Sequence, residues 1–205
     1  MSVSRKSDSE YTCFDRAITR FDFINAQDPN KIIHAGREYP RELLYGQRMS
    51  QCLDRYAPEA SEALRLAARS QHIQRWAIAR SSFPDNRQGY HRWRRALADF
   101  HAETVAGILR EIGYENTLIE RVAGLLRKQN LQHDAGAQCL EDVICLVFLE
   151  HYLDDFAKQH SEEKLIGILQ RTWQKMSPKG QTTALASPLS NRTRELVGKA
   201  LDGRV

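Results

Sequence analysis

The sequence predicts an all-α protein, a compact single domain of helices arranged around one buried helix at residues 139–156. Three observations predict this fold class. Apolar residues recur at helical spacing along most of the chain. No segment shows the apolar–polar alternation of a half-buried strand. Residues 143–149 are apolar at every position, and a helix without a polar face must be surrounded by protein.

Length and composition agree with one folded domain. The 205 residues are 41% hydrophobic and 27% charged, which is ordinary for a globular protein. We therefore expect a single helical domain over residues 11–205, preceded by a flexible N-terminus at residues 1–10. No apolar run approaches the ~18 residues of a membrane span, and residues 1–10 are polar. We expect a cytoplasmic protein without membrane attachment.

The first helix has an apolar face that runs from Phe14 to Ile24. It should end before Pro29, because the residue preceding a proline avoids helical backbone angles. Residues 31–39 are expected to form a loop that turns at Gly36. Pro40 then suits the first turn of a second helix.

Pro58 is expected to open a third helix with an alanine-rich middle, whose inward face continues to His72 and Trp76. Residues 81–89 are rich in turn-forming residues and are predicted to be the longest loop. The remaining helices follow the same periodicity and are expected at residues 90–112, 115–128, 139–156, from 162 onward and at 192–201. Gly113 is well placed to end the helix at 90–112.

Two carboxylates interrupt the apolar pattern at the expected start of the buried helix, Glu141 and Asp142. Burying a carboxylate costs several kcal/mol unless a charge, a metal or hydrogen-bond donors compensate. Either residue could cap the helix or pair with an arginine. Alternatively, one of them is a ligand in a central pocket.

Two histidines also occupy inward positions, His72 and His101. A histidine in such a place can be a hydrogen-bonded core residue, a metal ligand or a general base. With Asp142 they would come from three separate helices, and we predict that the three side chains share one pocket.

Arginines flank the loop at 81–89, with aromatic residues between them. Arg75, Arg80 and Arg94 could form a structural ion-pair network, or they could bind an anion, since a guanidinium contacts phosphate and carboxylate in a bidentate manner. The net charge of +4 is modest and mixed in sign along the chain, which disfavours nucleic acid as a partner.

The four cysteines show no paired metal-binding spacing. Cys13, Cys52, Cys139 and Cys145 contain no C-x-x-C motif, and three lie in apolar helical patterns. We expect reduced, buried thiols and no zinc site. Residues 175–177, Lys-Met-Ser, resemble a nucleotide-binding loop of class I aminoacyl-tRNA synthetases. That loop needs an α/β sheet, which this chain does not predict, so a simple turn at residues 178–180 is expected instead.

Sequence blocks spread over almost the whole chain resemble a domain-of-unknown-function family, numbered 4202. The resemblance implies no settled activity. The blocks include Leu43-Leu44-Tyr45-Gly46-Gln47-Arg48-Met49-Ser50, Gln71-His72-Ile73-Gln74-Arg75-Trp76, Gly89-Tyr90-His91-Arg92-Trp93-Arg94, Leu140-Glu141-Asp142-Val143 and Thr172-Trp173-Gln174-Lys175-Met176-Ser177.

The order of elements is similar, more distantly, to HD-domain phosphohydrolases, which bind a divalent metal. That resemblance implies metal ligands at His72, His101 and Asp142, and catalytic roles for His72, Asp142 and Glu141. The chain departs from the motif, because Gln71 stands where its histidine should be and His72 where its aspartate should be. Arg48 or Gln47 lies in the region of the usual first histidine. The resemblance and the arginine pattern together predict a phosphate- or anion-binding set at Arg48, Arg75, Arg80 and Arg94.

Three functions follow as hypotheses. The first is an HD-like metal-dependent phosphohydrolase that acts on a small phosphorylated metabolite or nucleotide. The second is a non-catalytic regulatory module that binds an anion or nucleotide in a degenerate HD-like pocket, because an arginine among the ligands repels a cation. The third, RNA association through residues 75–95, agrees least with the modest charge.

Overall fold

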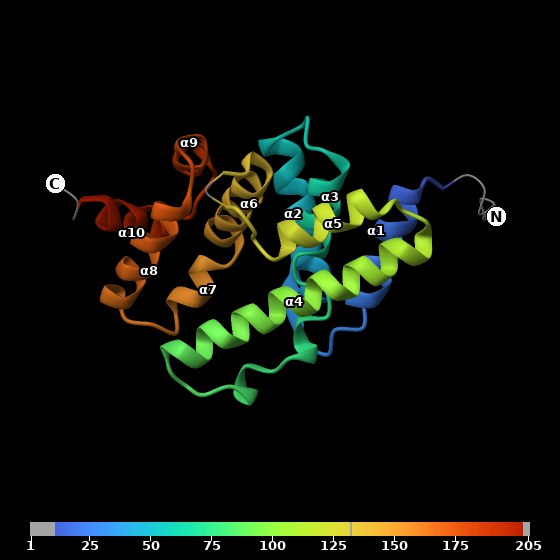
Figure 1. Cartoon of the computed structure of the whole chain (residues 1–205). Coiled ribbons are helices and arrows are strands. Elements are labelled where there is room, and N and C mark those ends of the chain that lie inside the picture. Colours follow the sequence, from blue (N-terminus) through green and yellow to red (C-terminus); the bar gives the residue numbers. More distant parts are fainter. Residues whose placement is uncertain (1–10, 132, 203–205) are drawn as a thin grey trace, which may run out of the picture. The chain divides into compact units, whose positions relative to one another are not determined.

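The computed structural model describes residues 11–131 and 133–202, and it confirms an all-α fold (Figure 1). The predicted N-terminal segment at residues 1–10 lies outside the described residues. The long helices are α1 (Cys13–Asn25), α2 (Arg41–Tyr56), α3 (Glu62–Ser70), α4 (Arg87–Ile112), α5 (Asn116–Leu126), α6 (Ala135–His151), α8 (Glu162–Lys175), α9 (Pro178–Ala186) and α10 (Asn191–Asp202). Shorter elements are α7 (Leu153–Ala157) and the 3-10 turns η2 (Arg75–Ala77) and η3 (Arg80–Ser82).

The chain forms two compact units. The first contains residues 11–50 and 60–129, and the second contains residues 51–59 together with 130–131 and 133–202. Helix α2 therefore contributes its first ten residues to the first unit and its end to the second. Within the described residues, no helix is long and apolar enough to cross a membrane.

The expected loop at residues 31–39 is instead a β-hairpin. Strand β1 (Lys31–His34) pairs antiparallel with β2 (Arg37–Pro40), and Ile32 lies opposite Tyr39. Ala35 and Gly36 both have positive φ, 49° and 74°, as a two-residue hairpin turn requires. Four-residue strands that are exposed over most of their length show no burial alternation, so the sequence pattern missed them.

The first unit packs α4 along α5 and α1, while α3 packs on α5 and α1. Its core includes the fully buried side chains of Phe21, Leu66, Ile73, Leu109 and Leu125. Helix α1 begins with the capping box of Thr12 and Asp15. Helix α4 ends at Gly113, which was predicted as its C-cap and has a φ of 100°.

Three helix boundaries of the first unit differ from the prediction. Helix α3 starts after the N-cap Ser61 rather than at Pro58, and it ends at Ser70. His72 therefore lies beyond the helix, in a turn that Gln74 completes with φ 47°. Helix α4 begins after the N-cap Asn86, so Gly89 is helical; a side chain there would collide with the Pro84 carbonyl.

The second unit is organised on α6, which is buried on nearly every side over residues 140–149. In the rest of the predicted segment 139–156, residues 151, 154 and 155 are exposed. The helix starts earlier than expected, after the N-cap Asp134, and stops at His151 because Tyr152 (φ −127°) leaves helical geometry. Glu141 and Asp142 therefore lie in the second turn rather than at the helix start. The expected turn at residues 178–180 is also wrong, because Pro178 opens α9 with Ser177 as its N-cap.

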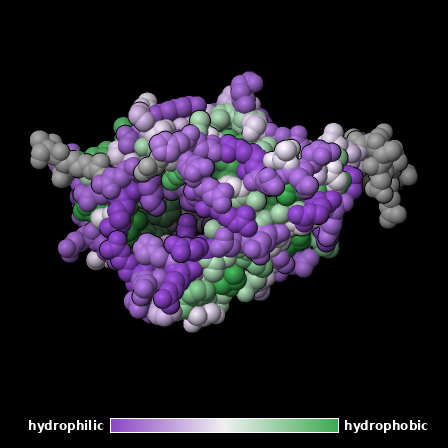
Figure 2. All heavy atoms as spheres, in the orientation of Figure 1, coloured by the Kyte–Doolittle hydropathy of each residue, from purple (hydrophilic) through white to green (hydrophobic). Residues whose placement is uncertain are grey.

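The cysteines and the surface complete the fold. None of the four cysteines, all of which lie among the described residues, forms a disulfide. Cys52 and Cys145 are buried as predicted, Cys139 is half-buried, and Cys13 is exposed, which corrects the expectation for that residue. On the face shown in Figure 2, hydrophilic residues predominate and hydrophobic ones form small separate groups.

Candidate functional site

The first unit contains a polar cluster around His72. Its Nδ1 lies 3.1 Å from Glu42 Oε2, and its Nε2 lies 3.4 Å from Arg75 Nη1. A guanidinium can only donate, so Nε2 is the acceptor and the ring proton resides on Nδ1, which donates to Glu42. His72 is thus a neutral imidazole held between a carboxylate and a guanidinium.

Aromatic rings hold the cluster in place. The Tyr45 ring stacks on His72 with centroids 4.0 Å apart and planes 13° from parallel. The Arg75 guanidinium lies 4.7 Å from the ring centroid of Trp93, a cation–π contact with α4. The His101 ring, also on α4, lies 6.1 Å from the His72 ring. Helices α2 and α4 and the turn after α3 therefore all contribute to this site.

Two buried side chains set the backbone of the site. Asn25 Oδ1 accepts from the backbone of Gln74 at 3.0 Å, and its Nδ2 donates to the carbonyl of Glu42 at 3.5 Å. Asp28 Oδ2 accepts from the backbone N–H of Glu42 at 2.9 Å, at the start of α2. Asn25, on α1, therefore connects the backbone of Gln74, which has left-handed geometry, with the backbone of Glu42.

Sequence reasoning missed Glu42, Asn25 and Asp28. Glu42 follows Pro40 in a first helical turn, where an acidic residue is expected for helix-dipole reasons alone. Asp28 immediately precedes Pro29, a position that by itself predicts only the end of the first helix. The usable signal was that Asn25 falls on the inward stripe of α1, where it is only 2% exposed.

Positive charge exceeds negative charge around His72. Burial lowers the pKa of His72 well below its usual value, and Arg75, Arg94, Lys128 and Arg41 lower it further. Burial raises the pKa of Glu42, against the opposing effect of Arg75, Arg41 and His101. Cationic side chains on α2, in the turn after α3 and on α4 therefore all act on His72, an arrangement that favours an added anion.

His101 is buried with its polar atoms unsatisfied. It is 4% exposed, and neither ring nitrogen has a hydrogen-bond partner among the described residues. Burial lowers the pKa of His101 to about 3, with further lowering by His72 and Arg75. The backbone of Ile73 opposes this shift, although it lacks the geometry of a full hydrogen bond.

The predicted arginines do not all belong to this cluster. Arg75 contacts His72, and Arg94 acts electrostatically on both His72 and Arg75. Arg80 donates to the Phe83 carbonyl at 2.9 Å and lies 3.4 Å from Asp85, which is the structural network considered as the alternative. Arg48 is buried, with Nη2 3.2 Å from His34 Nδ1.

Asp142 and Glu141 belong to the second unit, where Asp142 is the centre of a different cluster. Its Oδ1 accepts from the Ser177 backbone at 2.8 Å and from Gln138 at 3.1 Å. Its Oδ2 accepts from the Tyr56 hydroxyl at 2.8 Å and the Ser177 hydroxyl at 2.6 Å. Glu141 is buried, and its Oε1 lies 3.8 Å from Lys175 Nζ.

The residues predicted as metal ligands do not fit a divalent cation. His72 and His101 are neighbours, but the Arg75 guanidinium faces His72 Nε2. Asp142 already accepts four hydrogen bonds, two on each oxygen. In the described part of the chain, no group of three histidine, cysteine or carboxylate side chains is arranged to hold a metal ion. The shared pocket and the metal stay predictions, and we derive no chemistry through a metal.

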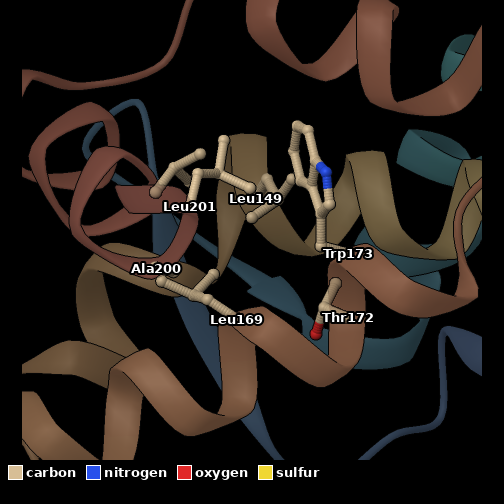
Figure 3. Close-up of a pocket in the computed structure, with 7 residues that line it drawn as sticks. Leu149, Leu169, Thr172, Trp173, Ala200 and Leu201 are labelled. Atoms are coloured by element: carbon tan, nitrogen blue, oxygen red, sulfur yellow. The ribbon is translucent and has the colours of Figure 1, made fainter. Parts of the chain in front are cut away.

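A small apolar pocket lies within the second unit, between α6, α8 and α10 (Figure 3). Its lining carries no charged group, and the Thr172 hydroxyl donates to the Ile168 carbonyl at 3.0 Å. We interpret it as a packing gap, because ligand sites usually add convergent polar groups to an apolar lining. The lining residues are Leu149, Leu169, Thr172, Trp173, Val197, Ala200 and Leu201.

Comparison with known proteins supports the first resemblance. The family model described as Domain of unknown function (DUF4202) matches residues 15–197. No curated protein and no solved structure matches the chain. The more distant similarity to HD-domain phosphohydrolases therefore stays a prediction.

Proposed function

The chain belongs to the DUF4202 family, whose description assigns no activity, and we therefore propose its function from the site: the first unit binds a small phosphate-bearing anion at His72, Arg75 and Arg94. The observation that carries this proposal is the excess of positive charge around His72. Arg75, Arg94, Lys128 and Arg41 all lower its pKa, and Glu42 is the carboxylate hydrogen-bonded to it in the described part of the chain.

Arg75 is suited to binding phosphate because its guanidinium is held in place. Arg75 is fixed over Trp93 and beside Glu42, and its side chain remains 23% exposed. A guanidinium fork matches phosphate geometry, and its preorganisation reduces the entropy lost on binding. Arg94 adds a second charge from α4. A partly accessible arginine that is held in place beside a second cationic side chain is suited to binding phosphate.

Binding can be tested by the thermal shift that inorganic phosphate produces at constant ionic strength. A ligand that binds only the folded state raises the melting temperature by mass action, with about 2.7 kcal/mol of stabilisation at a hundredfold excess over Kd. We expect a clear rise for the wild type, a smaller rise for Arg94→Ala, and an unchanged rise for the control Arg110→Ala. Arg110 is exposed and lies on the same helix.

The outcomes separate this proposal from a purely structural arginine network. Such a network predicts that Arg94→Ala lowers the melting temperature while phosphate leaves both proteins unchanged. An equal phosphate response in the wild type and Arg94→Ala would remove Arg94 from the site. No response in any of the three proteins would refute the proposal.

Hydrolysis of the bound ester is a second candidate function, favoured by the Glu42–His72 pair. A neutral histidine whose Nδ1–H donates to a carboxylate has the orientation of a general base. Arg75 faces the nitrogen that would accept the proton, so Arg75 would have to move. Phosphate release from glycerol 3-phosphate, measured with EDTA and with added magnesium or manganese, tests this function. Release abolished by His72→Asn would support it, and no release under either condition would refute it.

A further inference from the structure

His101 extends the proposal, because both of its ring nitrogens are buried without a hydrogen-bond partner among the described residues. The residue is 4% exposed, and its nitrogens have no partner in the described part of the chain. A buried donor or acceptor without a partner costs about 1–3 kcal/mol. Native proteins rarely leave such groups unmatched, and they are satisfied by a water or a ligand where the protein does not supply the partner.

The position of His101 relates it to the proposed phosphate site. Its ring lies 6.1 Å from the ring of His72, whose far nitrogen contacts Arg75. The side chains of His72 and Arg75 are also the charged or titratable neighbours that act most strongly on His101. An ester whose phosphate binds Arg75 could reach His101 with the atoms next to the phosphate, because His72 adjoins both residues.

We propose that the ligand is a phosphate ester of a hydroxylated compound, such as a polyol or sugar phosphate, and that His101 hydrogen-bonds a hydroxyl close to the phosphate. This inference rests on the proposed function. A hydroxyl is both donor and acceptor, so it can serve whichever ring nitrogen faces the ligand. An alkyl chain cannot satisfy a buried nitrogen, so the site should discriminate against esters without a hydroxyl.

Two probes of equal charge test the proposal. Glycerol 3-phosphate carries hydroxyls next to the phosphate, whereas ethyl phosphate carries none. By isothermal titration calorimetry, the wild type should bind glycerol 3-phosphate about tenfold more tightly, since each 1.4 kcal/mol is a tenfold change in Kd. His101→Leu should bind both esters with similar affinity, close to that of the wild type for ethyl phosphate. Arg94→Ala should weaken both esters equally and keep their ratio.

A second measurement uses the wild-type protein, so the proposal can be tested even if His101→Leu does not fold. In ¹⁵N-histidine NMR spectra, glycerol 3-phosphate should shift both ring nitrogens of His101, and ethyl phosphate should leave them near their ligand-free positions. The His101→Leu spectrum assigns the signals.

The failures of the two proposals are distinguishable. If neither ester nor inorganic phosphate binds the wild type, the anion site itself is wrong. If both esters bind with equal affinity and the His101 signals do not respond, the anion site stands and the hydroxyl proposal is overturned. That second outcome would mean that a buried water alone satisfies His101.

Discussion

Two buried polar clusters, one in each unit, differ in how completely their hydrogen bonds are satisfied. In the second unit, Asp142 accepts four hydrogen bonds from Tyr56, Gln138 and Ser177. In the first unit, one carboxylate faces several cationic side chains, and both nitrogens of His101 are unmatched among the described residues. Both clusters are largely shielded from water, so their hydrogen bonds and charges interact more strongly than they would at the surface.

The difference shows how a structural cluster can be told from a ligand site. The Asp142 carboxylate receives as many donors as it has lone-pair sites, so it needs nothing more and can join α6 to the start of α9. The His72 cluster has surplus positive charge and unused hydrogen-bonding capacity, which a ligand can supply. A count of donors, acceptors and charges therefore distinguishes a structural cluster from a ligand site, whereas burial alone does not.

The largest expected effect comes from removing the saturated carboxylate. Asp142→Ala should lower the free energy of unfolding by about 3–5 kcal/mol, because the Tyr56 hydroxyl and the Ser177 donors lose their acceptor in a buried place. The phosphate-induced thermal shift should be retained if the variant folds. Chemical denaturation measures the loss, and Asp155→Ala, which breaks an exposed pair with Lys158, is the control. Equal losses in the two variants would contradict the saturated-cluster interpretation.

A methyl group at Gly180 tests how closely the same cluster is packed. A Cβ there would lie 2.6 Å from Asp142 Oδ1, too close for any real contact. Gly180→Ala should lower the free energy of unfolding by about 1–3 kcal/mol, as overpacking usually does. Gly198→Ala, at a helical glycine with open space around it, should stabilise or leave stability unchanged. An unchanged free energy of unfolding in Gly180→Ala would show that the side chains around Asp142 can move to accommodate a methyl group.

The histidines of the first unit should make stability depend on pH. The pKa of His101 is about 3 in the folded protein against 6.5 in the unfolded chain. The unfolded state therefore binds more protons between these values, and stability is present above pH 6.5 and lost as the pH falls. Between pH 7 and pH 5 the wild type should lose about 2 kcal/mol more than His101→Leu.

The comparison with His101→Leu isolates one residue from its neighbours. The raised pKa of Glu42 acts in the opposite sense, because folding then favours proton uptake as the pH falls, but Glu42 is present in both proteins. At pH 7, His101→Leu should be as stable as the wild type or more so, since two unsatisfied polar atoms are removed. Urea unfolding of the two proteins at pH 7 and at pH 5 measures both the stability difference at pH 7 and the loss of stability between the two pH values. Parallel pH curves for the two proteins would show that His101 is solvated.

The smallest expected effect concerns the backbone of the ligand site. Asn25→Ala should cost about 1 kcal/mol, because the partly buried N–H of Gln74 loses its acceptor. The turn that carries His72 should then loosen, and the phosphate-induced thermal shift should fall more than the stability does. Gln27→Ala, which removes an exposed side-chain contact with the Phe23 carbonyl at the end of the same helix, is the control. A full phosphate response in Asn25→Ala would remove Asn25 from the positioning of the site.

Much of the fold could be predicted because it depends on local pattern. Helices α1 and α4 were predicted closely, since their apolar spacing and their stop signals, such as Gly113, lie within the segments themselves. The hairpin and α9 were missed because short, exposed or weakly apolar elements carry little periodic signal. The early end of α3 was missed because the left-handed Gln74 is held by Asn25, 49 residues away.

For the candidate site, too, local features could be predicted from the sequence and long-range contacts could not. By itself, the sequence determined the all-α class, the buried α6 and the list of polar residues in apolar surroundings, because hydrophobic periodicity and residue chemistry are local properties. Tertiary structure alone decided the partners: Glu42 beside His72, and Tyr56 and Ser177 around Asp142. Those pairs are separated by 30, 86 and 35 residues, and only packing determines which donor meets which acceptor across such distances.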